Sequence, residues 1–148
     1  MIGKARPQNQ MNLFRPMLHE FINMDHELVL LANTIDWGYF ERAFAKHYSR
    51  RGKPSMPIRF MTGSLLLKQK FNMGYKALVQ NWVMNPYMQY FCGEACFQHR
   101  FPCDPSDFAH FKKRIGAEGL QIIYDQLVKT NEKNVIISRD KSYSAPAS

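Results

Sequence analysis

The chain has little cysteine and no long apolar run, and each shortage excludes a class of protein. Its three cysteines are an odd number in 148 residues, which fits reduced thiols in a cytoplasm better than a disulfide framework. No apolar run approaches the ~18 residues of a membrane-spanning helix. Residues 1–10 include basic side chains, but no hydrophobic segment follows, so they do not form a signal peptide. We therefore expect a cytoplasmic protein with no membrane partner.

Carboxylates are also few, and they are scattered along the chain. A nuclease-type site needs carboxylates from separate elements to hold two metal ions. The chain has 12 acidic residues, of which Asp36 and Asp104 stand where helix caps are expected, and none lies on a convincing strand. We therefore predict no catalytic residue, no metal ligand and no cofactor in this chain.

Apolar and basic residues are abundant. Apolar residues make up 45% of the chain and aromatic residues 14%, which is enough for one compact domain with a hydrophobic core. The 20 lysines and arginines exceed the acidic residues, which gives a net charge of +8 and a pI near 9.5. Because phosphates supply most of the sequence-independent affinity for nucleic acid, this charge favours DNA or RNA as the partner.

The spacing of apolar residues predicts an all-α fold. We expect an irregular lead-in over residues 1–17, a multi-helix domain over 18–131, and a last segment over 132–148 that has a short strand at 135–137 and a disordered tail. Apolar residues recur at intervals of three or four in the stretches 18–31, 37–48, 57–71, 75–84, 105–115 and 120–130. Gly116 is expected to break the helix after Asp104, and residues 86–103 to form a packed connector without regular structure.

Asn72, Met73 and Gly74 separate two of the predicted helices. We expect these residues to form a tight turn in which Gly74 adopts the unusual backbone angles. Two helices joined in this way describe a helix-turn-helix, but they also describe any helical hairpin in a bundle.

Three groups of basic residues are the candidate DNA contacts. Cations on a fixed surface bind phosphates, and polar side chains on a helix reach base edges in the major groove. Each group alone is as well explained by a solvated face, but three groups with a high net charge favour DNA. The predicted contacts are Arg50, Arg51, Lys53 and Arg59 near the proline-containing loop, which Arg42 and Lys46 precede; Lys68, Lys70 and Lys76 around the turn; Gln80 and Asn81 on the second hairpin helix; and His110, Lys112, Lys113 and Arg114 on a later helix.

Cys92, Cys96, His99 and Cys103 form a C-x3-C-x2-H-x3-C pattern, which raises the alternative of a small zinc domain. Structural zinc sites more often use two cysteines separated by two residues, so we interpret these cysteines as small buried hydrophobes. A cysteine nucleophile is disfavoured further, because no His–acid pair is evident beside it.

Several motifs resemble the N-terminal region of insertion-sequence transposases that carry an RNase H-like DDE catalytic domain. The motifs are HELVLLA and IDW within residues 26–37, PIRFMTGSLLLK at 57–68, NPYMQYFCGE at 85–94, PCDPS at 102–106 and KRIG at 113–116. Together they cover about residues 19–130 in the order that is typical of the family.

This resemblance implies a DNA-binding domain that engages the terminal repeats of the element. In the family, the first catalytic Asp follows the strand that residues 135–137 would match, but this chain has Ser138 there and Asp140 two positions later. We therefore expect a chain truncated before the catalytic domain that is not an enzyme by itself. The resemblance implies Mg²⁺ as a cofactor for full-length members of the family, but not for this chain.

A protein–protein module is the alternative function. Four aromatic residues would then associate with a second copy of the chain or with full-length transposase. By binding the full-length enzyme, the chain would act as its inhibitor. They are Tyr87, Tyr90, Phe91 and Phe97.

Overall fold

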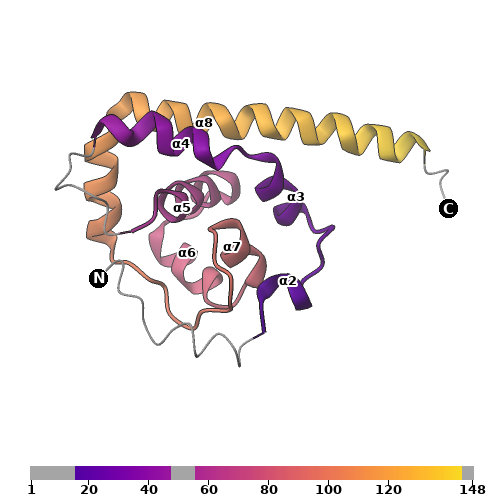
Figure 1. The fold of residues 1–148 in the computed structure, drawn as a ribbon, viewed down its shortest axis with the longest axis horizontal. Helices are drawn as coiled ribbons and strands as arrows, with labels where there is room; N and C mark the ends of the chain where they lie inside the picture. The colour runs from indigo at the N-terminus through magenta and orange to yellow at the C-terminus, as the bar shows by residue number, and fades with distance from the viewer. Residues whose placement is uncertain (1–15, 48–55, 145–148) are drawn as a thin grey trace.

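The computed structural model describes the backbone of residues 16–47 and 56–144, and side chains up to Thr130 (Figure 1). Within these ranges the fold contains seven α-helices and one short 3-10 helix, without a strand, so the all-α prediction is confirmed. The helices are α2 (Leu18–Phe21), α3 (Glu27–Thr34), α4 (Trp37–Phe44), the 3-10 helix η1 (Ala45–His47), α5 (Ile58–Phe71), α6 (Tyr75–Trp82), α7 (Pro86–Phe91) and α8 (Pro105–Ser144).

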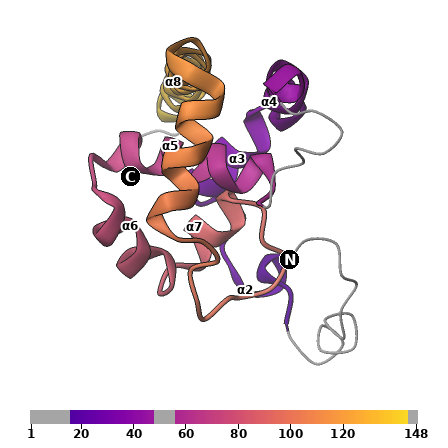
Figure 2. The ribbon, with the colours of Figure 1, turned by 90° about the vertical axis from the view of Figure 1, so that its left-hand side faces the viewer.

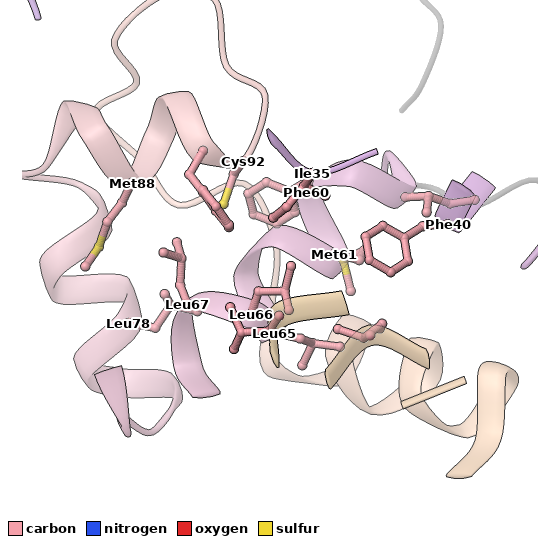
Figure 3. Packing of buried hydrophobic residues seen from close by; sticks show 14 of the residues in the cluster. Ile35, Phe40, Phe60, Met61, Leu65, Leu66, Leu67, Leu78, Met88 and Cys92 are labelled. Atoms are coloured by element: carbon pink, nitrogen blue, oxygen red, sulfur yellow. The ribbon is translucent and has the colours of Figure 1, made fainter. Parts of the chain in front are cut away.

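Helix α5 forms the centre of the fold and contacts α4, α6 and α8. Its residues 60–67 are all buried, which requires neighbours on every side because a helix that is apolar all round cannot face water. In Figure 3, Leu67 points towards Leu78 of α6, and Met61 points towards Phe40 of α4. Helices α4, α6 and α8 therefore take their positions from α5, whereas α2 and α3 pack against α7.

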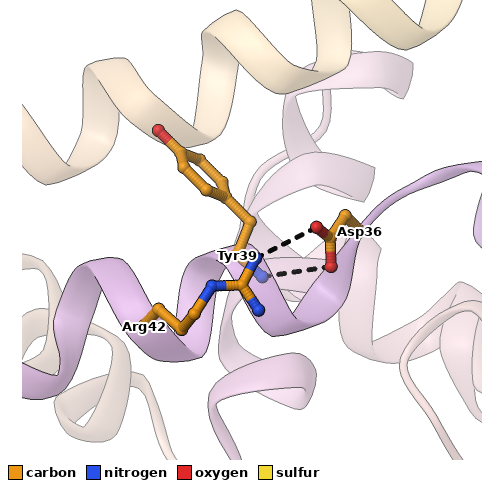
Figure 4. A network of polar contacts seen from close by, with 3 residues as sticks. All are labelled: Asp36, Tyr39 and Arg42. Carbon is orange, nitrogen blue, oxygen red and sulfur yellow. Dashed lines mark hydrogen bonds and ion pairs between the residues drawn. The ribbon is translucent and has the colours of Figure 1, made fainter.

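The start of α4 is fixed by the side chain of Asp36 (Figure 4). One carboxylate oxygen accepts a hydrogen bond from the backbone N–H of Tyr39 at 3.2 Å, and the other pairs with Arg42 at 3.1 Å. The first contact satisfies a backbone donor that the helix leaves unpaired at its N-terminus. The prediction that Asp36 is a helix cap is confirmed.

The turn between α5 and α6 lies where the sequence placed it, but a different residue has the unusual backbone. Asn72 is left-handed, with φ 50° and ψ 53°, whereas Gly74 is extended, with φ −82° and ψ −179°. The prediction for Gly74 is therefore wrong. The left-handed residue closes the end of α5, since it lets the N–H of Met73 donate to the carbonyl of Lys68 at 3.0 Å.

Part of the predicted connector at residues 86–103 is helical. The Asn85 side chain accepts hydrogen bonds from the backbone N–H groups of Tyr87 and Met88 at 2.9 and 3.2 Å, and Pro86 occupies the first helical position. The Asn85-Pro86 pair therefore ends α6 and also begins α7, because both residues favour a helix N-terminus. The prediction of a connector without regular structure is therefore wrong for residues 86–91.

Helix α8 contains a sharp break at Gly116, whose φ of 71° and ψ of −175° are not helical. The prediction of a break there is confirmed. The strand predicted at 135–137 is wrong, because helix continues through these residues to Ser144, including residues 138–144, for which no regular structure was expected. A strand needs a hydrogen-bonding partner, which the described residues lack, whereas a helix pairs its own backbone groups. Figure 1 shows this second part of α8 extending beyond the other helices.

None of the helices in the described part of the chain combines the length and the apolar character that a membrane crossing requires.

Candidate nucleic-acid interface

The first part of α8 has a buried apolar face and an exposed basic face. Phe108, Phe111 and Ile115 are buried, and the Phe111 ring lies 6.0 Å from that of Phe44 in α4. The basic face carries His110, Lys113 and Arg114, all exposed and spaced by three and four residues along one side of the helix. We call these three residues the α8 basic stripe.

Helix α6 also turns polar residues outward. Lys76 and Gln80 are exposed one helical turn apart, while Leu78 and Trp82 are buried on the opposite side. Asn81 is exposed as well, but its side-chain N–H donates to the carbonyl of Ala77 at 2.7 Å. Lys76 and Gln80 are therefore the residues of α6 that are best placed to contact a ligand.

Lys68 of α5 lies within electrostatic reach of Lys112 of α8 across the contact between these helices, although 44 positions separate them in the chain. Both are half-buried, and the Lys68 ammonium lies 6.0 Å from the centre of the Phe108 ring. Burial lowers the pKa of Lys68, and the positive charge of Lys112 lowers it further. Figure 2 shows the first part of α8 lying over α5.

Lys70 forms an ion pair with the exposed carboxylate of Glu27. Its ammonium lies 2.8 Å from a carboxylate oxygen of Glu27 in α3, and its side chain is only 16% exposed. The hydrogen bond from Lys70 is the main reason that the pKa of Glu27 is lowered. The charge of Lys70 is therefore already matched by a carboxylate.

Arg59 interacts with the end of α7. Its guanidinium donates to the carbonyls of Tyr90 and Phe91 at 3.2 and 3.4 Å, and it lies 4.7 Å above the Trp37 ring. Burial lowers the pKa of Arg59. A cation at the C-terminus of a helix satisfies its unpaired carbonyls, so Arg59 connects α5, α7 and α4. Nothing in the local sequence indicates this role, since the two carbonyls that accept its hydrogen bonds lie more than 30 residues away.

Replacing Arg59 with methionine is expected to lower the free energy of unfolding by about 2 kcal/mol, because hydrogen bonds from a charged donor are lost. Urea unfolding followed by circular dichroism measures the loss. R100M, which changes an exposed arginine, is the control and should shift stability by less than about 0.5 kcal/mol. Equal effects of the two variants would contradict the structural role of Arg59.

The remaining predicted contacts lie elsewhere. Arg50, Arg51 and Lys53 lie outside the described residues. Arg42 pairs with Asp36, and Lys46 is exposed on η1.

The cysteines pack separately in the interior. Cys92 lies 3.7 Å from the Ser64 hydroxyl, whereas Cys96 lies 3.6 Å from the sulfur of Met17. Burial raises the pKa of both Cys92 and Cys103 to about 12. The described residues contain no group of three or more His, Cys, Asp or Glu side chains that could hold a metal ion. The zinc alternative therefore finds no support in the arrangement of these thiols.

Taken together, these elements define a small all-helical basic domain that has a helical hairpin and a basic stripe on its longest helix. Residues 16–114, about two thirds of the chain, match the family described as Transposase domain (DUF772). The chain belongs to this family, which confirms the resemblance to transposases that the sequence motifs indicate.

A curated relative adds little about function. The "Uncharacterized protein ORF8 in nfe locus" of Rhizobium meliloti is 41% identical over 118 residues, which cover 79% of this chain and 57% of that protein. The chain thus spans little more than half the length of this relative. No solved structure matches the chain.

Proposed function

We propose that this domain binds DNA on behalf of a transposase and contacts the terminal repeats of its element. The observation that carries the proposal is the α8 basic stripe, His110, Lys113 and Arg114, on the surface of a transposase-family domain. A rigid helix holds these side chains on one face, as phosphate contacts require. The net charge of +8 adds long-range attraction to the duplex.

Helix α6 is the proposed reader of base edges. It is the second helix of a hairpin with a short turn, which is the position of the recognition helix in a helix-turn-helix. Gln80 can form a paired contact with adenine, and Lys76, one turn earlier, can contact a phosphate or guanine. Their exposure on the outer face of α6 supports this role.

The acidic residues of the described helices support DNA binding rather than strand transfer as the contribution of this domain. Asp36 caps α4, and Glu27 pairs with Lys70. Asp107 accepts a hydrogen bond from the backbone N–H of Asp104 at 2.8 Å at the start of α8. These carboxylates stabilise separate parts of the fold, whereas a two-metal site needs several of them at one place.

Fluorescence anisotropy with labelled duplexes tests the proposal. The terminal repeats of the element and an unrelated duplex of equal length are compared at about 50 mM and about 200 mM salt. We expect tighter binding to the repeats, and affinity for both duplexes that falls steeply with salt, because each phosphate contact adds about 0.9 to the log–log slope. If the domain binds neither duplex at the lower salt concentration, the proposal is refuted.

Association between copies of the chain is a second candidate function, and an exposed apolar groove favours it. Phe21 is 50% exposed and Met84 74% exposed at this groove, where a second copy would cover apolar surface. The groove is lined by Pro16, Phe21, Met84, Pro86, Phe97 and His99.

Of the aromatic residues predicted for such an interface, only Phe97 lines the groove. Phe91 is fully buried, Tyr87 stacks on His26, and the Tyr90 hydroxyl donates to Asn33 at 3.1 Å. Light scattering over a range of protein concentrations tests this candidate. A monomer at every concentration would exclude it.

A further inference from the structure

The basic side chains near the α5–α8 contact differ in their partners. Arg42 pairs with Asp36 at 3.1 Å, and Lys70 pairs with Glu27 at 2.8 Å. Lys68 and Lys112 form no ion pair with any carboxylate of the described residues, and Lys112 lies near enough for its charge to act on Lys68. These two lysines therefore form a like-charged pair across the contact between α5 and α8.

The packing of α8 on α5 brings both lysines to the neighbourhood of Phe108. The Lys68 ammonium lies 6.0 Å from the centre of the buried Phe108 ring on α8. Lys112 follows Phe108 by one helical turn, so it projects from the same face of α8. Both lysines are half-buried, as is usual for lysines whose carbon chains lie along apolar surface.

Such a pair is unfavourable in the protein alone. Two like charges at a partly buried position repel more strongly than they do in water. Burial is the main cause that lowers the pKa of Lys68, and the charge of Lys112 lowers it further, which is the direction that repulsion between the two lysines produces. An anion bound between the two ammonium groups would replace the repulsion with two attractions.

We propose that Lys68 and Lys112 together form a site for one phosphate of the DNA backbone. This inference rests on the proposed DNA-binding function and specifies one point of contact for it. Two ammonium groups supply charge and several N–H donors to a phosphate, which offers acceptor oxygens in several directions. The site joins α5, the first helix of the hairpin, to α8, which carries the basic stripe.

The test compares K68M, K112M and the double variant, because methionine keeps the apolar chain and removes the charge. DNA affinity at about 100 mM salt is expected to fall about 8-fold in each single variant, and the log–log salt slope to fall by about 0.9. The double variant should lose little more than either single variant, since both lysines serve one phosphate. Without DNA, each single variant should melt about 2 °C higher, because the repulsion is gone.

K70M is the matched control. It removes the same charge from the same helix two positions away, but from a lysine that already pairs with Glu27. We expect its DNA affinity to change less than about 2-fold and its melting temperature to fall. Equal loss of affinity in K68M and K70M would overturn the inference, because net charge alone would then explain the loss. K112R should bind as the wild type does, and failure of this variant would also count against a purely electrostatic site.

A second measurement separates the site from the function. Melting temperatures of the wild type and of K68M/K112M are compared in phosphate and in chloride at equal ionic strength. Phosphate should stabilise only the wild type.

The outcomes distinguish the site from the function. If the wild type binds DNA and all variants bind it with the same affinity, the site is refuted and the function stands. If the wild type binds no duplex, the function and the DNA source of the phosphate are refuted together. Phosphate-specific stabilisation would then still identify a site for free phosphate, and its absence would refute the site altogether.

Discussion

Reversing the charges of Lys113 and Arg114 together is expected to weaken DNA binding about 100-fold at about 100 mM salt. Each phosphate contact that is lost removes about 0.9 log units of affinity under these conditions, because its counterions are no longer released. Two contacts account for about 60-fold, and repulsion between the new carboxylates and the phosphates adds the remainder. The two residues are adjacent on the exposed face of α8, so both changes act at one part of the duplex.

Anisotropy titrations of K113E/R114E at several salt concentrations measure this effect. The log–log slope should decrease by about 2 relative to the wild type. R100E/K129E is the control, because it makes the same total charge change at two exposed positions outside the proposed interface. Circular dichroism should show an unchanged helix content in both variants. If the control weakens binding as much as K113E/R114E does, attraction by net charge explains the binding and α8 is not the contact surface.

Replacing Trp82 with alanine is expected to lower the free energy of unfolding by about 3–5 kcal/mol. Trp82 is fully buried at the end of α6, and its ring lies 5.9 Å from that of Phe60 and 5.2 Å from that of Phe101. Alanine would leave a large apolar cavity between α5, α6 and the segment that precedes α8. This loss is a large part of the ~5–15 kcal/mol that stabilises a domain of this kind.

Two matched variants make the Trp82 result specific. M84A changes a residue that is 74% exposed two positions later, so its effect should stay below about 0.5 kcal/mol. W82F retains an aromatic ring in the same place and should cost only about 1–2 kcal/mol. Urea unfolding of the three variants measures these losses of stability, which should decrease in the order W82A, W82F, M84A. If W82A and M84A unfold at the same urea concentration, α6 does not contribute to the cooperative core, which would also remove the rigid support of Lys76 and Gln80.

Patterns within a few residues predicted much of this fold. The apolar spacing predicted α5, α6 and the break of α8 at Gly116, because a helix repeats its faces every three or four residues. Asp36 was recognisable as a cap because its hydrogen bond reaches only three residues ahead. The errors at Gly74 and at residues 86–91 also concern local geometry, where several residues satisfy the same turn or cap.

Charge counts and motifs predicted the class of protein, but they did not assign roles to individual cations. In the sequence, Arg59, Lys68 and Lys70 are three basic residues of one helix. The tertiary structure places Arg59 on the carbonyls at the end of α7, Lys70 on Glu27, and Lys68 beside Lys112. Their partners lie 31 to 44 residues away along the chain, so no local pattern indicates them.

The same division holds for the whole molecule. By itself, the sequence determined a basic, helical domain of the transposase family, because composition, helical spacing and family motifs are all encoded locally. Only the tertiary structure decided which basic side chains bind carboxylates or carbonyls of the fold and which lie on the exposed faces of the helices. That outcome depends on how α8 packs on α5 and on where α3 and α7 lie relative to its basic residues, because tertiary structure brings together charges that are distant in the chain.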